Sequence, residues 1–131
     1  MKLLKVLLAD DDDNIRVVLK QWLAKLGCAV VDVGSADEAR RALSRQTFDL
    51  VITDVLMPGG DGIDLIEHVK KSQPETRVLA ISGGGRYLRG NDCLKIASGM
   101  GAHAVAMKPF TREQFFAAIA DAMRPEPKPA G

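Results

Sequence analysis

The sequence has little of what a small disulfide-bonded or membrane-bound protein needs. It contains only two cysteines, Cys28 and Cys93, and neither stands in a metal-ligand motif. The apolar stretch at residues 3–9 is too short to span a bilayer, and it ends in acidic residues without a signal-peptide cleavage site. We therefore expect reduced thiols, a cytoplasmic location and no membrane-spanning segment.

An excess of charge of one sign is also absent. Lys and Arg number 18 and Asp and Glu number 17, which leaves a net charge of +1. Such a balance provides no strong field, and no basic stripe is apparent, so we do not expect direct nucleic-acid binding. With 131 residues, 47% of them hydrophobic, the chain is long enough for one domain with a single core.

Short apolar runs alternate with helical patterns along the chain. Each run is nearly continuous in hydrophobic residues, which is typical of a strand covered on both faces. The helix expected after the first run carries an apolar stripe and ends at Gly27. This alternation predicts an α/β protein with a parallel sheet and helices on both of its faces. The predicted strands are Lys5–Ala9, Ala29–Val33, Phe48–Thr53, Arg77–Ile81 and His103–Met107.

Polar residues mark the expected beginnings of the helices. Two segments match the capping box, in which a hydroxyl accepts from a backbone N–H and a side chain three residues later reaches back. Single aspartates are expected to cap two further helices. These residues are Ser35 with Glu38, Thr111 with Gln114, Asp13 and Asp61. Phe110 and Phe115 have the spacing of a hydrophobic staple, and another helix is expected over 88–98.

Ligands of open parallel sheets bind beyond the carboxyl ends of the strands. The polar residues that the predicted strands place there are Asp10, Asp11, Asp54, Ser82 and Lys108. Carboxylates crowded together raise one another's pKa unless a cation joins them. A hard cation such as Mg²⁺ would stabilise the cluster, and a carboxylate nucleophile, a lysine and a hydroxyl are parts for phosphoryl transfer.

Each of these residues also has a simpler interpretation when it is taken alone. Aspartates after a strand are usually solvated turn or cap residues, and we accept that interpretation for Asp12 and Asp13. Asp54 and Ser82 could be turn residues, and Lys108 could be a solvated surface lysine. It is their conjunction at one edge of the sheet that favours a functional site.

Four segments, in order, resemble the receiver domain of two-component response regulators. They are Asp10-Asp11, DLVITDVLMPGGDG (Asp49–Gly62), AISGG (Ala80–Gly84) and GAHAVAMKPF (Gly101–Phe110). The resemblance implies a flavodoxin-like, doubly wound five-stranded parallel sheet in the order 2-1-3-4-5 with five helices. It places the receiver domain at 1–124, and the proline-rich composition of 125–131 predicts a disordered tail or linker.

The resemblance also implies a function. A sensor histidine kinase or histidine phosphotransfer protein would phosphorylate the chain, which would then change its affinity for a downstream protein effector. Such a domain catalyses only its own phosphorylation and dephosphorylation, and it would be a monomer or a weak homodimer. Asp54 would be the phosphoacceptor, while Ser82 and Lys108 would contact the phosphoryl group. The implied Mg²⁺ ligands are Asp10 (through water), Asp11, Asp54 and the backbone carbonyl of Leu56.

The chain departs from the family pattern in three places. Val105 stands where the family often has an aromatic switch residue, and Gly60 stands where a larger apolar residue is usual. The chain between Ser82 and Lys108 is also longer than is usual. We therefore expect the switch to lie in the loop 83–92, although a tolerated surface insertion would explain the extra residues equally well.

Two alternatives remain open at this point. The segment Asp10–Asp12 also fits the D-x-D core of haloacid-dehalogenase-like phosphatases, in which Asp10 would be the nucleophile. Against this, Asn14 is not the residue that the motif requires, and no later pair of acids completes its metal site. The third possibility is a receiver-like adaptor that is never phosphorylated. The aspartate that becomes phosphorylated distinguishes the receiver domain from the phosphatase. Absence of any phosphorylation indicates the adaptor.

Overall fold

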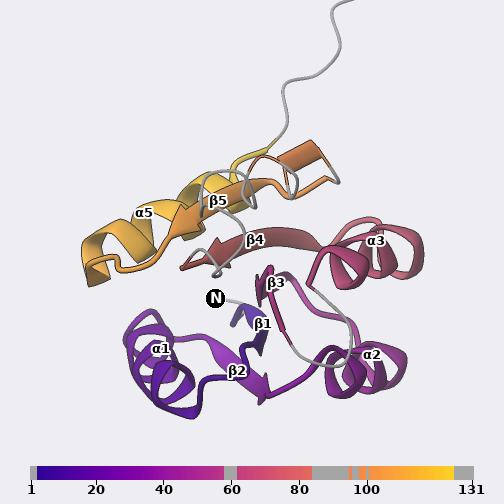
Figure 1. Cartoon of the computed structure of the whole chain (residues 1–131), viewed down its shortest axis with the longest axis horizontal. Coiled ribbons are helices and arrows are strands. Elements are labelled where there is room, and N and C mark those ends of the chain that lie inside the picture. Colours follow the sequence, from indigo (N-terminus) through magenta and orange to yellow (C-terminus); the bar gives the residue numbers. More distant parts are fainter. Residues whose placement is uncertain (1–2, 58–61, 84–94, 96–97, 100, 126–131) are drawn as a thin grey trace, which may run out of the picture.

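The computed structural model describes residues 3–57, 62–83, 95, 98–99 and 101–125, which form one five-stranded parallel sheet flanked by helices (Figure 1). The strands lie in the order β2-β1-β3-β4-β5, which confirms the predicted order. The strands are β1 (Lys5–Ala9), β2 (Ala29–Val33), β3 (Leu50–Asp54), β4 (Arg77–Ser82) and β5 (Ala104–Met107). The helices are α1 (Asp13–Lys25), α2 (Ala36–Arg45), α3 (Gly62–Ser72) and α5 (Arg112–Met123).

Five helices were predicted, and four are counted among the described residues. The helix expected over 88–98 lies almost entirely outside these residues, as does the loop that was expected to hold the switch. The predicted cap Asp61 and the tail beyond Pro125 also lie outside them.

The predicted bounds of three strands differ from the observed ones. β3 begins two residues later than predicted and includes Asp54. The N–H of Phe48, which was predicted to open this strand, donates to the side chain of Gln73 rather than to a neighbouring strand. β4 extends one residue further, to Ser82, and β5 begins at Ala104. Asp54 and Ser82 are therefore held as the last residues of buried strands, and not as turn residues.

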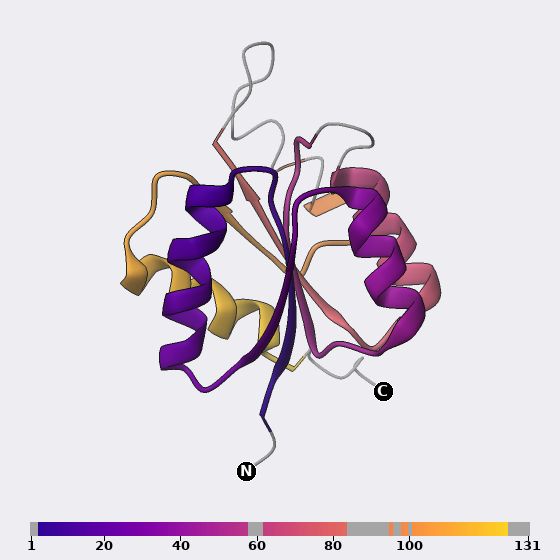
Figure 2. The same ribbon diagram turned by 90° about the horizontal axis from the view of Figure 1, so that it is seen from below.

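Successive residues of the central strands pack against different helices. In β1, Val6 and Leu8 contact the core under α1 and α5, whereas Leu7 and Ala9 contact the core under α2 and α3. Figure 2 shows these two pairs of helices on opposite faces of the sheet. Because side chains alternate along a strand, a strand covered on both faces must be apolar throughout. This explains why the sequence shows continuous apolar runs.

Helix α1 is capped by Asp12, so the prediction of Asp13 as the N-cap was wrong. Asp12 has an extended backbone, and its carboxylate accepts from the N–H groups of Asn14 at 2.9 Å and Ile15 at 3.2 Å. Only a residue with a non-helical backbone just before the first turn can direct its side chain back in this way. Asp13 is already helical, and its carboxylate pairs with Arg16.

The start of α5 confirms the predicted capping box. The Thr111 hydroxyl accepts from the N–H of Gln114 at 3.1 Å, and the Gln114 side chain accepts from the N–H of Thr111 at 2.8 Å. The rings of Phe110 and Phe115 stack with their centroids 5.4 Å apart, as a hydrophobic staple requires. This motif fixes how the chain turns from β5 into α5.

The box predicted at the start of α2 is only half formed. The Ser35 hydroxyl accepts from the N–H of Glu38 at 3.2 Å, as expected. The Glu38 carboxylate, however, accepts from the N–H of Gly34 at 2.7 Å rather than from that of Ser35. The acidic side chain thus stabilises the residue before the cap and not the cap itself.

Candidate functional site

The sheet brings the predicted site residues to one edge. Asp10 and Asp11 follow β1, Asp54 and Ser82 end β3 and β4, and Lys108 follows β5. All the strands run in the same direction, so their carboxyl ends meet at this edge (Figure 2). Each of the five residues therefore ends a strand or directly follows one, and is not positioned by a long loop.

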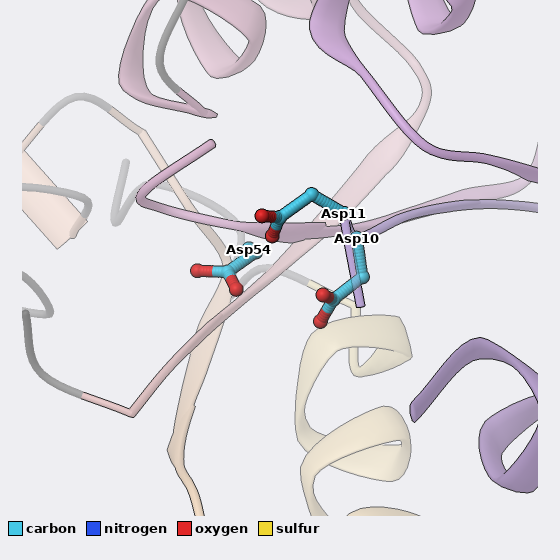
Figure 3. A group of neighbouring side chains, drawn as sticks. All are labelled: Asp10, Asp11 and Asp54. Carbon is cyan, nitrogen blue, oxygen red and sulfur yellow. The ribbon is translucent and has the colours of Figure 1, made fainter. Parts of the chain in front are cut away.

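Three carboxylates converge at the site. Asp10, Asp11 and Asp54 each offer an oxygen, and these oxygens all lie within 4.8 Å of one another. Asp10 and Asp54 are buried, whereas Asp11 is exposed. Figure 3 shows the Asp11 and Asp54 carboxylates extending into the same space from neighbouring strand ends. Hard divalent cations bind oxygen ligands of this kind, so the residues present fit a Mg²⁺ ion.

Lys108 links two of these carboxylates. Its Nζ donates to Asp10 Oδ2 at 2.7 Å and to Asp54 Oδ2 at 3.0 Å. The other oxygens accept from the backbone: Asp10 Oδ1 from the N–H of Asp12 at 2.9 Å, and Asp54 Oδ1 from the N–H of Leu56 at 3.0 Å. Both buried carboxylates thus have both oxygens hydrogen-bonded, as buried charges require.

Burial raises the pKa of the Asp54 carboxyl above its ordinary value, and the charge of Asp10 adds to this, although Leu56 and Lys108 oppose it. For Lys108, burial opposes the charge, but the hydrogen bonds and charges of Asp10 and Asp54 outweigh it, so its pKa is raised. The ammonium is therefore held charged between the two carboxylates. The Asp54 carboxylate is therefore protonated more easily than an exposed aspartate.

Replacing Lys108 with methionine tests this balance. We expect the variant to lose about 2 kcal/mol of unfolding free energy at neutral pH, less than for a fully buried pair because the Asp54 carboxylate can take up a proton. Without Lys108, the pKa of Asp54 rises further. The folded state then binds more protons than the unfolded state, so the variant loses stability as the pH rises through that pKa.

Urea unfolding without divalent ions checks this prediction at pH about 4.5 and about 7.5, both above the ordinary aspartate pKa of about 3.9, where the unfolded chain is ionised. The deficit relative to the unsubstituted chain should be larger at the higher pH. Lys71→Met is the matched control, because Lys71 forms an exposed ion pair with Glu67 and should matter little at either pH. Equal deficits at both pH values would contradict the prediction.

Ser82, Val105 and the Leu56 carbonyl were also predicted as site residues. Ser82 is fully buried at the end of β4, and its backbone carbonyl accepts from the N–H of Lys108 at 2.8 Å. Val105 lies in β5 with 39% of its surface exposed. Leu56 contacts Asp54 through its N–H and not its carbonyl, so the predicted ligand role of that carbonyl stays a prediction. The peptide bond between Lys108 and Pro109 is cis.

The sequence analysis missed Gly62, the first residue of α3. A Cβ atom at this position would lie only 1.8 Å from the backbone oxygen of Asp54. The N–H of Gly62 also donates to the carbonyl of Val55 at 2.9 Å. The signal was present as the last glycine of the segment DLVITDVLMPGGDG, where only Gly60 had been considered. Gly62 allows α3 to begin directly against the end of β3.

Together, the sheet and the acidic pocket at its carboxyl edge define a flavodoxin-like α/β protein with a candidate metal site. The chain belongs to the response regulator receiver domain family, whose model matches residues 6–120. As a receiver domain, it is a phosphorylation-activated switch of two-component signalling. This membership confirms the resemblance and does not favour the phosphatase alternative.

Known proteins of similar sequence and structure support this assignment. The chain is 36% identical over 125 residues to the DNA-binding transcriptional regulator NtrC of Azospirillum brasilense, covering 95% of this chain and 25% of that protein. A receiver domain structure from Clostridium thermocellum has a TM-score of 0.81 at 31% identity, with 92% and 94% of the two chains covered. For the beryllofluoride-activated NtrC4 receiver domain dimer, the TM-score is 0.79 at 30% identity, with 91% and 95% covered.

The chain spans about a quarter of the length of the curated relatives that it matches. The comparisons do not support the expectation that direct nucleic-acid binding is absent, because the relative from Azospirillum brasilense is named as a DNA-binding regulator. No helix of the described residues is long and apolar enough to cross a membrane. The expected cytoplasmic location stays a prediction.

Proposed function

We propose that Asp54 is the phosphoacceptor of this receiver domain. The observation that carries this proposal is the position of Asp54 at the end of β3, where Lys108 bridges it to Asp10. Lys108 Nζ would move from the carboxylates to an oxygen of the incoming phosphoryl group. The other Asp54 oxygen stays hydrogen-bonded to the N–H of Leu56, which holds the nucleophile in place.

The donor would be a phosphorylated histidine of a sensor kinase or of a histidine phosphotransfer protein. An Asp54 oxygen attacks the phosphorus, a P–O bond forms, the P–N bond breaks, and the electron pair returns to the histidine nitrogen. Dephosphorylation would occur when water attacks the phosphorus, the P–O bond to Asp54 breaks, and inorganic phosphate leaves with the Asp54 carboxylate restored. The chain would therefore act only on itself. Asp10, Asp11 and Asp54 would hold a Mg²⁺ ion, which neutralises the charge that builds up on the phosphoryl oxygens.

The phosphorylated chain would act by binding a protein, either an effector or a second copy. Val105 and Met107 lie on β5, the strand at one side of the sheet, and their apolar side chains are exposed. These side chains support a protein contact at β5. The related NtrC4 receiver domain is described as a dimer when activated. Any binding of DNA would belong to regions outside the receiver domain.

Locating the phosphate tests the proposed acceptor. After incubation with a small acyl phosphate and Mg²⁺, we expect mass spectrometry of proteolytic peptides to show one phosphate per chain, on the peptide that contains Asp54. Removal of Mg²⁺ with EDTA should abolish the label, because the single charge of Lys108 cannot balance both the carboxylates and the phosphoryl oxygens. A phosphate on Asp10 would support the phosphatase alternative, and complete absence of label would support the adaptor alternative.

A further inference from the structure

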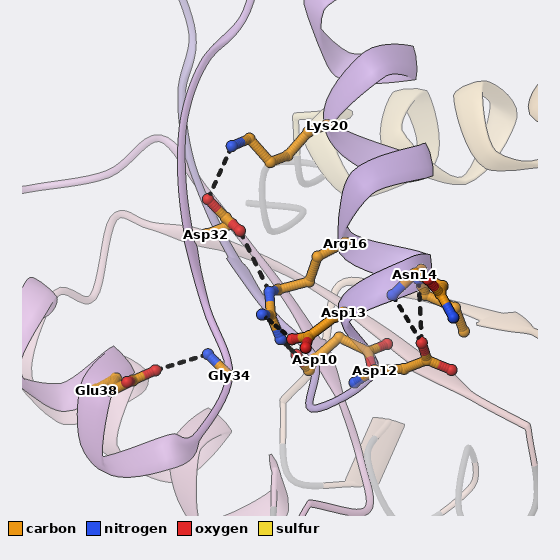
Figure 4. A network of polar contacts seen from close by, with 10 residues as sticks. Asp10, Asp12, Asp13, Asn14, Arg16, Lys20, Asp32, Gly34 and Glu38 are labelled. Atoms are coloured by element: carbon orange, nitrogen blue, oxygen red, sulfur yellow. Dashed lines mark hydrogen bonds and ion pairs between the residues drawn. The ribbon is translucent and has the colours of Figure 1, made fainter.

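Arg16 ties the loop that carries Asp10 and Asp11 to helix α1 and strand β2. Its Nη1 donates to the backbone oxygen of Asp10 at 2.5 Å, and its Nε donates to Asp32 Oδ2 at 3.2 Å (Figure 4). Its Nη2 pairs with the carboxylate of Asp13. The side chain is only 17% exposed. A planar guanidinium with donors in a fixed fork can hold three acceptors at once, which an ammonium cannot do in the same geometry.

The contact to Asp10 is made with the peptide group that joins Asp10 to Asp11. Because a peptide group is planar, holding its oxygen sets the direction in which the chain enters Asp11. The Asp10 carboxylate is held separately, by the N–H of Asp12 and by Lys108. Asp11 is exposed, and in the described part of the chain its carboxylate accepts no hydrogen bond. The direction of that carboxylate therefore depends on the backbone that Arg16 holds.

Other residues hold Arg16 in this place. Asp32, on β2, pairs with both Arg16 and Lys20. Burial acts to raise the pKa of Asp32, but Lys20 and Arg16 together outweigh it, so the pKa is lowered. The guanidinium of Arg16 packs close to the backbone of Gly34, which has no side chain. A Cβ atom at Gly34 would lie only 3.1 Å from Arg16 Nη1. The arrangement is therefore built from α1, β2 and the loop after β1 together.

We propose that Arg16 is a positioning residue of the magnesium site, which orients Asp11 by fixing the Asp10–Asp11 peptide group. This inference rests on the proposed Mg²⁺ site. Residues that orient metal ligands typically contribute about 10- to 100-fold to metal affinity. Arg16 holds the main chain and not the ligand itself, so we expect a smaller contribution, about three- to tenfold.

The sign of the effect separates this role from simple electrostatics. Removing a positive charge near a cation site should strengthen Mg²⁺ binding if charge alone matters. Loss of positioning should weaken it. Lys20→Met is a matched control, because Lys20 lies on the same helix and pairs with the same carboxylate of Asp32, whereas the Asp10 carbonyl is held by Arg16.

The experiment is a Mg²⁺ titration followed by the amide resonances of Asp11 and Asp54, with the folded state of each variant checked by its thermal transition. Arg16→Met should raise the dissociation constant about three- to tenfold, and Lys20→Met should leave it unchanged or lower it. Arg16→Lys keeps the charge but cannot reach all three acceptors, so it should raise the constant as well. It also serves as the second variant if Arg16→Met does not fold.

Tighter or unchanged Mg²⁺ binding in both Arg16 variants would overturn the inference. Absence of Mg²⁺ binding in the unsubstituted chain would instead overturn the proposed metal site, so the two failures are distinguishable. In the acyl phosphate assay, the Mg²⁺ concentration for half-maximal rate should rise in the Arg16 variants, while the rate at saturating Mg²⁺ stays close to that of the unsubstituted chain. A lower rate at saturating Mg²⁺ with an unchanged half-maximal concentration would contradict a positioning role.

Discussion

Replacing Asp54 with asparagine is expected to abolish phosphorylation of this chain by a small acyl phosphate. A neutral amide oxygen is too poor a nucleophile to attack phosphorus, and no other carboxylate of the site ends β3. The amide oxygen can still accept from the N–H of Leu56 or from Lys108, so the fold should be kept. The measurement is the fraction of phosphorylated chain by mass spectrometry at equal times.

Asp12→Asn is the matched control for this prediction. It makes the same chemical change in the acidic segment Asp10–Asp13, outside the three converging carboxylates, and asparagine caps a helix about as well as aspartate does. Because the Asp12 side chain accepts from the N–H groups of α1, we expect its variant to be phosphorylated almost as well as the unsubstituted chain. Undiminished phosphorylation of Asp54→Asn, together with loss in Asp10→Asn, would show that Asp10 is the nucleophile.

Replacing Gly62 with alanine is expected to destabilise the protein by about 3 kcal/mol or more, at the upper end of the costs of overpacking. The added methyl carbon would lie 1.8 Å from the backbone oxygen of Asp54, and neither atom can move away by a side-chain rotation. Either the start of α3 or the end of β3 must shift. Phosphorylation should fall as well, because either shift disturbs the packing of α3 against the strand end that holds Asp54.

Urea unfolding and the acyl phosphate assay measure the two effects of this substitution. Gly99→Ala makes the same change where a Cβ atom would meet nothing within 4 Å, so we expect little change in either measurement. If Gly62→Ala were as stable as the unsubstituted chain, the backbone around Gly62 could move to admit a methyl group without loss of unfolding free energy. The close approach of Gly62 to Asp54 would then have no structural importance.

Much of the fold could be predicted because its signals are local. Continuous apolar runs indicate strands buried on both faces, and Gly27 ends α1 with a φ of +77° that side-chain-bearing residues rarely adopt. The capping box at Thr111 was also found from four consecutive residues. One mispredicted bound involves a distant partner, since the N–H of Phe48, just before β3, donates to the side chain of Gln73.

The candidate site was predicted for a related reason. Parallel strands place their carboxyl ends at one edge, so any polar residue that follows a predicted strand can be assigned to that edge without knowledge of distances. The choice of cap in the acidic segment failed, because four adjacent aspartates offer the same side chain and only the backbone angles distinguish them. The cap is Asp12, and Asp13 pairs with Arg16.

The sequence by itself determined the order of strands and helices, the edge at which Asp10, Asp54 and Lys108 lie, and the family to which they point. Only the tertiary structure decided that Lys108 bridges two carboxylates, one of them 98 residues away, and that Gly62 lies against Asp54. It also decided that Arg16 holds the Asp10 carbonyl while Asp32 holds Arg16. The physical reason is that apolar periodicity sets which face of an element is buried, whereas contacts between polar side chains depend on how separate elements pack.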